Sequence, residues 1–246
     1  VLPTVLVALV VFQGLLGMWT VTLLVKPAVV TAHLAGGLTT LALLWWLALR
    51  QGEYFLTAPN PQLAELRPWV WAGLLLVCVQ ILLGGWTSTN YAALACTEFP
   101  TCYGGIWWPP TDFSEAFVLW RGLGINYEFG VLDSDARTAI HLTHRLGALL
   151  VTVYIGSLAL SLVRRADNYI QRRLGLALAA ALVFQVGLGI ANVVAQFPLS
   201  VAVAHNGGAA VLLLVLVTLV HVTQPPAQPA VAASDRRRRA GLRYSS

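Results

Sequence analysis

Four of the five histidines stand near one end of a long apolar segment, where an imidazole is costly to place. They are His33, His141, His144 and His205; the fifth, His221, ends its segment and is predicted to be interfacial. Polar groups at such depth ligate a cofactor or hydrogen-bond a neighbouring helix. Imidazole is an axial ligand of haem iron, and bundle cores place such ligands on facing helices. The pattern favours a haem site, while zinc or copper is disfavoured because no cysteine or carboxylate shares that depth.

The histidines belong to a repeated sequence pattern. Gln13 precedes Gln185 by 172 residues, and the same offset separates His33 from His205. A weaker third copy, VQILLG at residues 79–84, keeps the spacing Gln-x3-Gly. A matched glutamine and histidine at one offset across two segments indicates a duplicated helix pair, and the chain is predicted to contain three such pairs.

Glycines follow the three histidines of these pairs within one helical turn. They are Gly36, Gly37, Gly147, Gly207 and Gly208. A flat macrocycle needs room beside its ligand, so we interpret these glycines as clearance for a haem. Close helix packing, which also uses small residues, is the alternative.

Six apolar segments, each about as long as a bilayer is thick, must position these residues. The chain has 246 residues, of which 58% are hydrophobic and 10% charged, far from the composition of a soluble domain. Strands are disfavoured because only helices and closed barrels satisfy their backbone in lipid. We therefore predict an all-α integral membrane protein with six transmembrane helices, over Pro3–Leu24, Ala28–Leu49, Trp69–Thr89, Thr138–Val163, Arg173–Ala195 and Val201–Val222.

The positions of the basic residues predict the orientation in the membrane. Most arginines lie in the segments that share a side with both termini, which favours cytoplasmic termini and an outward loop at 91–137. The net charge of +5 is therefore assigned to orientation and to anionic lipid, and no nucleic-acid partner is expected.

Three stretches resemble one known family, the heme A synthases. They are LGGWTSTNYAALAC at residues 83–96, FPTC at residues 99–102 and IHLTHR at residues 140–145. The opening QGLLGMWTV at residues 13–21 and TAHL at residues 31–34 are also similar to that family's third and fourth helices. The resemblance covers essentially residues 1–222 and implies an eight-helix bundle of two pseudo-symmetric four-helix halves.

The resemblance implies that the chain lacks the first helix pair of the family. The start of the sequence at Val1, without a methionine, favours the same expectation. The expected parts are the second helix pair of the N-terminal half at residues 1–50 and a cytoplasmic loop at 51–67. The C-terminal four-helix half follows at 68–223, with its outer loop at 91–137, and a basic, disordered cytoplasmic tail ends the chain at 224–246.

The resemblance also implies roles for individual residues. His144 and His205 would ligate a haem b iron, and His33 would be a ligand on the side where the substrate haem O binds. Arg145 pairs with a haem propionate or else extends to the lipid headgroups. The glutamate implicated in catalysis in the family is absent from this chain, and His141 occupies the equivalent place, so no catalytic residue is identified.

The implied reaction is an oxidation of one haem O methyl group to a formyl group, giving haem A, with oxygen from water. Expected partners are haem O, haem A, membrane lipid, a haem O synthase, an electron acceptor and a second copy of the chain in a homo-oligomer. The expected location is the inner (plasma) membrane. A b-type electron-transfer cytochrome with two histidine ligands, or a haem carrier, would need the same bundle and remains the alternative. The isolated chain is expected to bind one haem and to have little activity.

Two cysteines flank a short proline-containing stretch of the predicted outer loop. An oxidising compartment favours a disulfide between Cys96 and Cys102, serving as a loop staple or in a redox role. Cys78 lies inside an apolar segment and is predicted to be a packing residue. The long outer loop is expected to cover the haem site.

Overall fold

The structure is a computed structural model that describes residues 1–52 and 61–224. The described part of the chain contains six long helices and two short ones, and within it the only β-pairing is an isolated bridge between Tyr103 and Ile106. The long helices are α1 (Leu2–Thr22), α2 (Pro27–Gln51), α4 (Arg67–Thr89), α6 (Ser134–Arg164), α7 (Tyr169–Val194) and α8 (Leu199–Val222); the short ones are α3 (Pro61–Ala64) and α5 (Phe113–Ala116).

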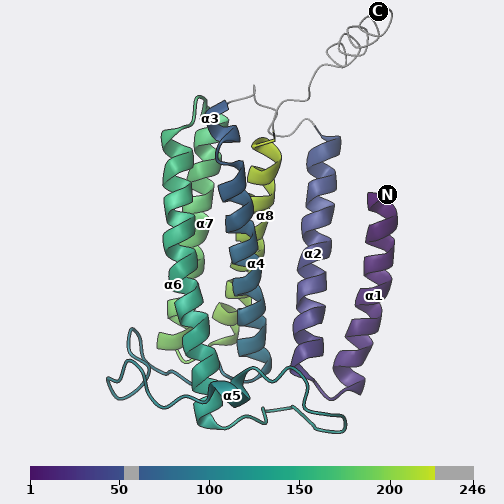
Figure 1. The fold of residues 1–246 in the computed structure, drawn as a ribbon, viewed down its shortest axis with the longest axis vertical. Coiled ribbons are helices and arrows are strands. Elements are labelled where there is room, and N and C mark those ends of the chain that lie inside the picture. Colours follow the sequence, from purple (N-terminus) through teal and green to yellow (C-terminus); the bar gives the residue numbers. More distant parts are fainter. Residues whose placement is uncertain (53–60, 225–246) are drawn as a thin grey trace, which may run out of the picture.

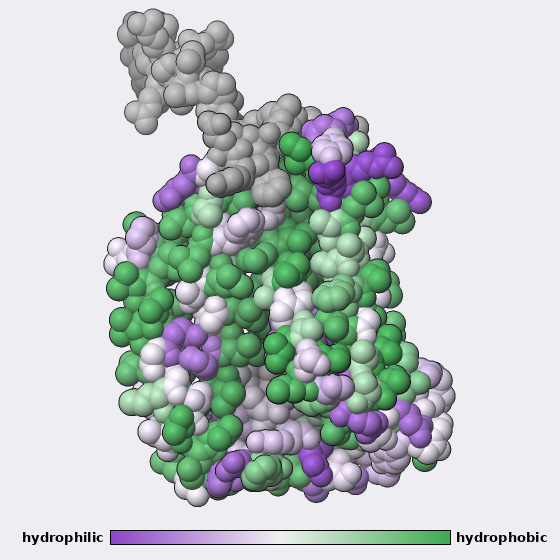
Figure 2. Space-filling model, turned by 180° about the vertical axis from the view of Figure 1, so that it is seen from behind, coloured by the Kyte–Doolittle hydropathy of each residue, from purple (hydrophilic) through white to green (hydrophobic). Residues whose placement is uncertain are grey.

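All six long helices are apolar enough and long enough to cross a membrane. The predicted all-α membrane class is confirmed, and the chain is a multi-pass membrane protein. Figure 2 shows the consequence on one face, where apolar residues dominate the middle and hydrophilic residues gather near the two ends. The predicted tail at 224–246 lies outside the described residues except for Gln224.

Two helices begin four residues earlier than their apolar segments predict. The side chain of Asp133 accepts a hydrogen bond from the backbone N–H of Ala136 at the start of α6. Asn168 accepts one from the N–H of Gln171 at the start of α7. These capping residues satisfy free N–H groups of the first turn, and because the first turns are polar, hydropathy alone does not include them.

The helices run antiparallel to their sequence neighbours, and α4, α6, α7 and α8 close into a four-helix bundle (Figure 1). Helix α2 packs against α4 and α8 of this bundle, and α1 packs on α2. The indole N–H of Trp45 in α2 donates to the hydroxyl of Thr218 in α8 at 2.9 Å. Helix α1 is at the edge of the structure, with only Leu6 and Leu16 buried.

The largest core cluster lies inside the four-helix bundle and includes Val70, Ile155, Leu162, Leu178 and Leu216, none of them more than 1% exposed. Because lipid tails are as apolar as these side chains, the cluster stabilises the bundle mainly by close van der Waals packing. We call the end of the bundle that carries residues 90–133 the loop end; it is the lower end in Figure 1.

The duplication predicted from sequence extends to the backbone of the turns. Leu24 and Val25 after α1 have φ angles of 53° and 60°, and Gln196 and Phe197, 172 residues later, have 59° and 60°. In each turn the N–H of the second residue donates to the carbonyl five residues earlier, at 2.8 Å and 2.7 Å. Both turns are therefore Schellman-type helix ends built without glycine, which costs backbone strain at non-glycine residues.

Candidate functional site

Each of the three helix pairs places one glutamine beside one histidine. Gln13, Gln80 and Gln185 each lie nine residues before the last residue of their helix, in α1, α4 and α7. The amide nitrogen of Gln13 donates to the backbone carbonyl of His33 at 2.9 Å, and that of Gln80 donates to the carbonyl of His144 at 2.9 Å. The three pairs therefore share a local arrangement near the loop end.

The glutamine amides also approach the imidazole rings in two of the pairs. The amide nitrogen of Gln80 lies 3.0 Å from Nδ1 of His144, and that of Gln185 lies 3.4 Å from Nε2 of His205. Among the described residues, Nδ1 of His33 and Nδ1 of His205 are buried without a hydrogen-bond partner. Buried ring nitrogens of this kind are suited to a bound group or a proton on the ring.

The glycine four residues after each glutamine contacts the neighbouring imidazole. A Cβ atom built on Gly17, Gly84 or Gly189 would lie 3.3, 3.2 and 3.2 Å from Cε1 of His33, His144 and His205. These are closer than ordinary van der Waals contacts, so a larger residue would push the ring aside. The glycines of the glutamine helices therefore accommodate the histidine rings.

The glycines of the histidine helices correct one interpretation made from sequence. At Gly36, Gly147 and Gly208 the place of a Cβ atom is taken by the amide oxygen of the facing glutamine. A Cβ on Gly37 would also face Gln13, 3.3 Å from its amide nitrogen, and only Gly207 of the five glycines has open space beside it. In the structure the space beside four of these glycines is thus occupied by a glutamine side chain.

His144 comes from α6 and lies beside Gln80 of α4, whereas His205 comes from α8 and lies beside Gln185 of α7; all four helices belong to the four-helix bundle. His33 lies in α2, outside that bundle. Within the described residues no three His, Cys, Asp or Glu side chains gather closely enough to hold one metal ion. The structure therefore places His144 and His205 in the four-helix bundle and His33 in a helix outside it.

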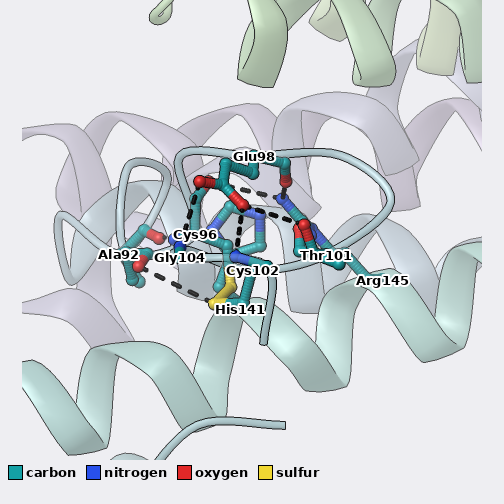
Figure 3. The surroundings of a disulfide bond; sticks show 10 residues. Ala92, Cys96, Glu98, Thr101, Cys102, Gly104, His141 and Arg145 are labelled. Atoms are coloured by element: carbon teal, nitrogen blue, oxygen red, sulfur yellow. Dashed lines mark hydrogen bonds between the residues drawn. A yellow bond between two sulfur atoms is a disulfide. The ribbon is translucent and has the colours of Figure 1, made fainter. Parts of the chain in front are cut away.

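Arg145, which follows His144, holds the backbone of the disulfide loop (Figure 3). One terminal nitrogen donates to the carbonyl of Thr101 at 2.8 Å, and the other donates to the carbonyls of Cys96 at 3.3 Å and Glu98 at 2.8 Å. The predicted disulfide joins Cys96 and Cys102, which are both fully buried. The guanidinium thus fixes the fold of this loop from the position next to His144 in α6.

His141 is a second anchor for the same loop. Its Nδ1 atom lies 2.9 Å from the carbonyl oxygen of Ala92 and 3.3 Å from the backbone nitrogen of Cys96. According to the tautomer, Nδ1 either donates a hydrogen bond to the Ala92 carbonyl or accepts one from the N–H of Cys96. The side chain is 4% exposed. The role of His141 as an anchor could have been found in the sequence from its spacing of four residues to Arg145, which places both side chains on one face of α6.

Inside the loop, the carboxylate of Glu98 accepts three hydrogen bonds. The donors are the backbone N–H groups of Gly105 and Gly104, both at 3.0 Å, and the hydroxyl of Thr101 at 2.9 Å. The N–H of Gly105, then the Thr101 hydroxyl, hold the pKa of the Glu98 carboxyl below its ordinary value of 4.5.

This lowered pKa predicts a loop that loosens in acid. Because the folded pKa is depressed, the contribution of Glu98 is present at neutral pH and is lost as the pH falls from about 4.5 through the folded value. We expect the amide proton resonances of Gly104 and Gly105 to shift upfield over that range in an NMR titration. Glu98→Gln should remove the transition, and an unchanged titration in that variant would contradict the assignment.

Sequence reasoning missed the role of Lys26, which begins the turn into α2. Its side chain is 2% exposed, its ammonium donates to the carbonyl of Gly122, and it lies 3.4 Å from the ring centre of Trp120. The ring of Tyr127 lies 5.8 Å away, and the N–H of Tyr127 donates to the carbonyl of Leu24 at 3.0 Å. The lysine therefore fastens the long loop to the α1–α2 turn.

Lys26→Met is expected to destabilise this attachment by about 2 kcal/mol, because it removes one charged hydrogen bond and one desolvated cation–π contact. Limited proteolysis should then cleave residues 117–130 faster than in the parent protein. Tyr127→Phe keeps the ring and is the matched control. Equal cleavage of Lys26→Met and Tyr127→Phe would show that the lysine does not fasten the loop.

The geometry defines a class: a multi-pass helical membrane protein with a glutamine-contacted histidine in each of three helix pairs and a disulfide-stapled loop. The chain belongs to the COX15-CtaA family of cytochrome oxidase assembly proteins, whose family model matches residues 1–217. The resemblance inferred from sequence is thereby confirmed.

Individual relatives carry the name heme A synthase. The protein of Shewanella oneidensis is 46% identical over 219 residues, which cover 89% of this chain and 65% of that protein. The protein of Rhodospirillum centenum is 33% identical over 172 residues, covering 70% and 43%, and that of Caulobacter vibrioides is 30% identical over 215 residues, covering 82% and 57%. The chain thus spans between 43% and 65% of the length of these relatives.

Proposed function

We propose that this chain is the larger part of a heme A synthase, an oxidoreductase that converts haem O to haem A. The observation that carries the proposal is the 46% identity with the Shewanella oneidensis heme A synthase over 89% of the chain. The histidine pair and its loop lie within the matched family region, which supports the same assignment. The alternatives, an electron-transfer cytochrome or a haem carrier, are not favoured by these relatives.

His144 and His205 are the proposed ligands of a haem b iron. Both side chains lie near the loop end of the four-helix bundle, each beside a glutamine amide, and the buried Nδ1 of His205 has no partner among the described residues. These features fit a group held between two imidazoles. A haem bound there would supply a one-electron redox centre. The chain's own part is to orient both rings and, through the loop held by Arg145, to keep water from their outer side.

His33 is the proposed ligand on the substrate side. It has the same glutamine and glycine neighbours as the other two histidines, which supports a common role. The proposed net reaction converts a methyl group and one water into a formyl group, four protons and four electrons. The electrons pass to an acceptor, which together with a haem O synthase completes the proposed set of partners.

Arg145 is also a candidate for a haem propionate, as the sequence predicts. Its two terminal nitrogens already hold three carbonyls, while its buried Nε has no partner among the described side chains. Any propionate contact would therefore use Nε or share the terminal nitrogens with the loop.

The proposed location is the inner membrane, with both termini in the cytoplasm and the disulfide loop outside. Cysteines persist as disulfides in oxidising compartments, which supports an outward loop end. We further propose contact with anionic lipid on the cytoplasmic side and association with further copies of the chain.

The proposed activity is tested by expressing the complete gene to which this chain belongs in cells that make haem O but not haem A. Extracted haems should include a haem with a formyl group, identified by mass and by absorption. Haem O alone in cells that contain the membrane-inserted protein would overturn the proposal and favour the cytochrome or carrier.

A further inference from the structure

We propose that the three repeated glutamines are positioning residues that fix the orientation of the imidazole rings, and that the glycine three residues after each histidine exists to admit the glutamine. The inference rests on the proposed haem ligation by His144 and His205. It assigns a role to Gln80, Gln185 and Gln13 that the sequence pattern shows only as a repeat.

The first support is the direction of the amide groups. The amide nitrogen of Gln80 donates to the carbonyl of His144 in α6, while the amide oxygen of the same side chain lies against Gly147 of that helix. The same nitrogen lies 3.0 Å from Nδ1 of that histidine. One side chain of α4 therefore holds both the backbone and the ring of the histidine.

The second support explains an unusual feature of these amides. Among the described side chains, the amide oxygens of Gln13, Gln80 and Gln185 are buried and have no conventional hydrogen-bond partner. Each lies where a Cβ atom of Gly36, Gly147 or Gly208 would be, so a Cα–H bond of that glycine points at the oxygen. Such Cα–H···O contacts recur at close helix interfaces and compensate part of the missing hydrogen bond.

The third support is the glycine of the glutamine helix that lies beside each imidazole ring. A Cβ atom on Gly84 or Gly189 would lie 3.2 Å from Cε1 of His144 or His205, so any other residue at these positions would push the ring aside. Each ring therefore occupies space that only a glycine leaves free. The amide nitrogen approaches the ring at His144 and His205, and the two glycine features recur in all three pairs. This recurrence supports a requirement of the histidine and not of helix packing in general.

Ring orientation matters because groups that hydrogen-bond a metal-ligating histidine set its orientation and basicity. These properties in turn tune the reduction potential and the electronic spectrum of a ligated haem. A glutamine that only packed two helices would affect stability without changing either quantity at full haem content.

Neighbouring glycines of α8 give a matched pair of variants. In Gly208→Ala the new methyl group occupies the place of the Gln185 amide oxygen and must displace it, whereas in Gly207→Ala it meets open space. Both changes raise helix propensity, so a purely structural effect has the same sign in both. The measurements are haem content, the electron paramagnetic resonance spectrum of the oxidised haem, and its midpoint potential, on the purified full chain.

We expect Gly208→Ala to shift the g values and the midpoint potential, with Gly207→Ala unchanged. Gln80→Leu should produce a comparable shift at the His144 side. If Gly207→Ala perturbs the haem as much as Gly208→Ala, or if none of the three variants changes the spectrum at full haem content, the inference is wrong.

A double variant keeps the test valid if Gly208→Ala does not fold. Gln185→Ala/Gly208→Ala vacates the space that the new methyl group needs and should recover folding, with the spectrum of Gln185→Ala alone. A double variant that stays unfolded while Gln185→Ala folds would contradict the inference. Absence of haem from the parent chain would instead overturn the proposed function, so the two failures are distinguishable.

Discussion

Replacing His205 with alanine is expected to abolish low-spin haem in the purified protein. His205 and His144 lie in α8 and α6 of the four-helix bundle and are the two proposed axial ligands, so removal of one would leave the iron with a single protein ligand. We expect haem content to fall at least about tenfold, since second-sphere changes alone typically cost 10–100-fold in metal affinity. Haem content per chain and the absorption spectrum of the reduced protein are the measurements.

The matched control is His221→Ala, at the other end of the same helix. His221 stands edge-on to Trp46, with ring centres 5.7 Å apart, far along α8 from the histidine pair. Its removal should leave the haem spectrum intact. Retention of a low-spin spectrum with two nitrogen ligands in His205→Ala would refute the assignment of that ligand.

The second large effect is expected from Arg145→Met, which removes all hydrogen bonds from the guanidinium to the carbonyls of Cys96, Glu98 and Thr101. Hydrogen bonds from a charged donor contribute about 1.5–3 kcal/mol each, and partial exposure of this site reduces that value. We expect a loss of about 2–4 kcal/mol in the free energy of unfolding. Thermal unfolding in detergent measures the stability. In a separate experiment, the rate at which dithiothreitol reduces the Cys96–Cys102 disulfide measures the opening of the loop.

Arg165→Met provides the comparison, because its ion pair with Glu65 at 3.2 Å is exposed and contributes little. Arg145→Lys keeps the charge but cannot reach three carbonyls with a planar fork, so an intermediate loss is expected. Equal stability and equal reduction rates in Arg145→Met and Arg165→Met would show that the arginine does not hold the loop.

The helices could be predicted from sequence because each is a continuous apolar run. A single run of that length satisfies all its backbone hydrogen bonds in lipid only as a helix. The duplication was equally visible, since Gln13 and His33 recur together at one offset. The polar first turns of α6 and α7 were missed because their caps, Asp133 and Asn168, lie outside the apolar runs.

The contacts of the loop were beyond prediction for a different reason. Lys26 meets Gly122 across 96 residues and Arg145 meets Thr101 across 44, and no local pattern encodes such pairings. The glycines illustrate the same limit. Their spacing after the histidines was correct as a signal of close approach, but spacing alone does not tell whether a cofactor or the side chain of Gln185 occupies the vacated space.

The central claim is that His144 and His205 together ligate one haem inside the bundle. Electron paramagnetic resonance of the oxidised, purified chain, combined with near-infrared magnetic circular dichroism, reports the two axial ligands directly. Low-spin haem with two imidazole ligands in the parent chain, lost in both His144→Ala and His205→Ala but kept in His33→Ala, is the predicted result. A spectrum with two imidazole ligands that survives either of the first two substitutions would contradict it.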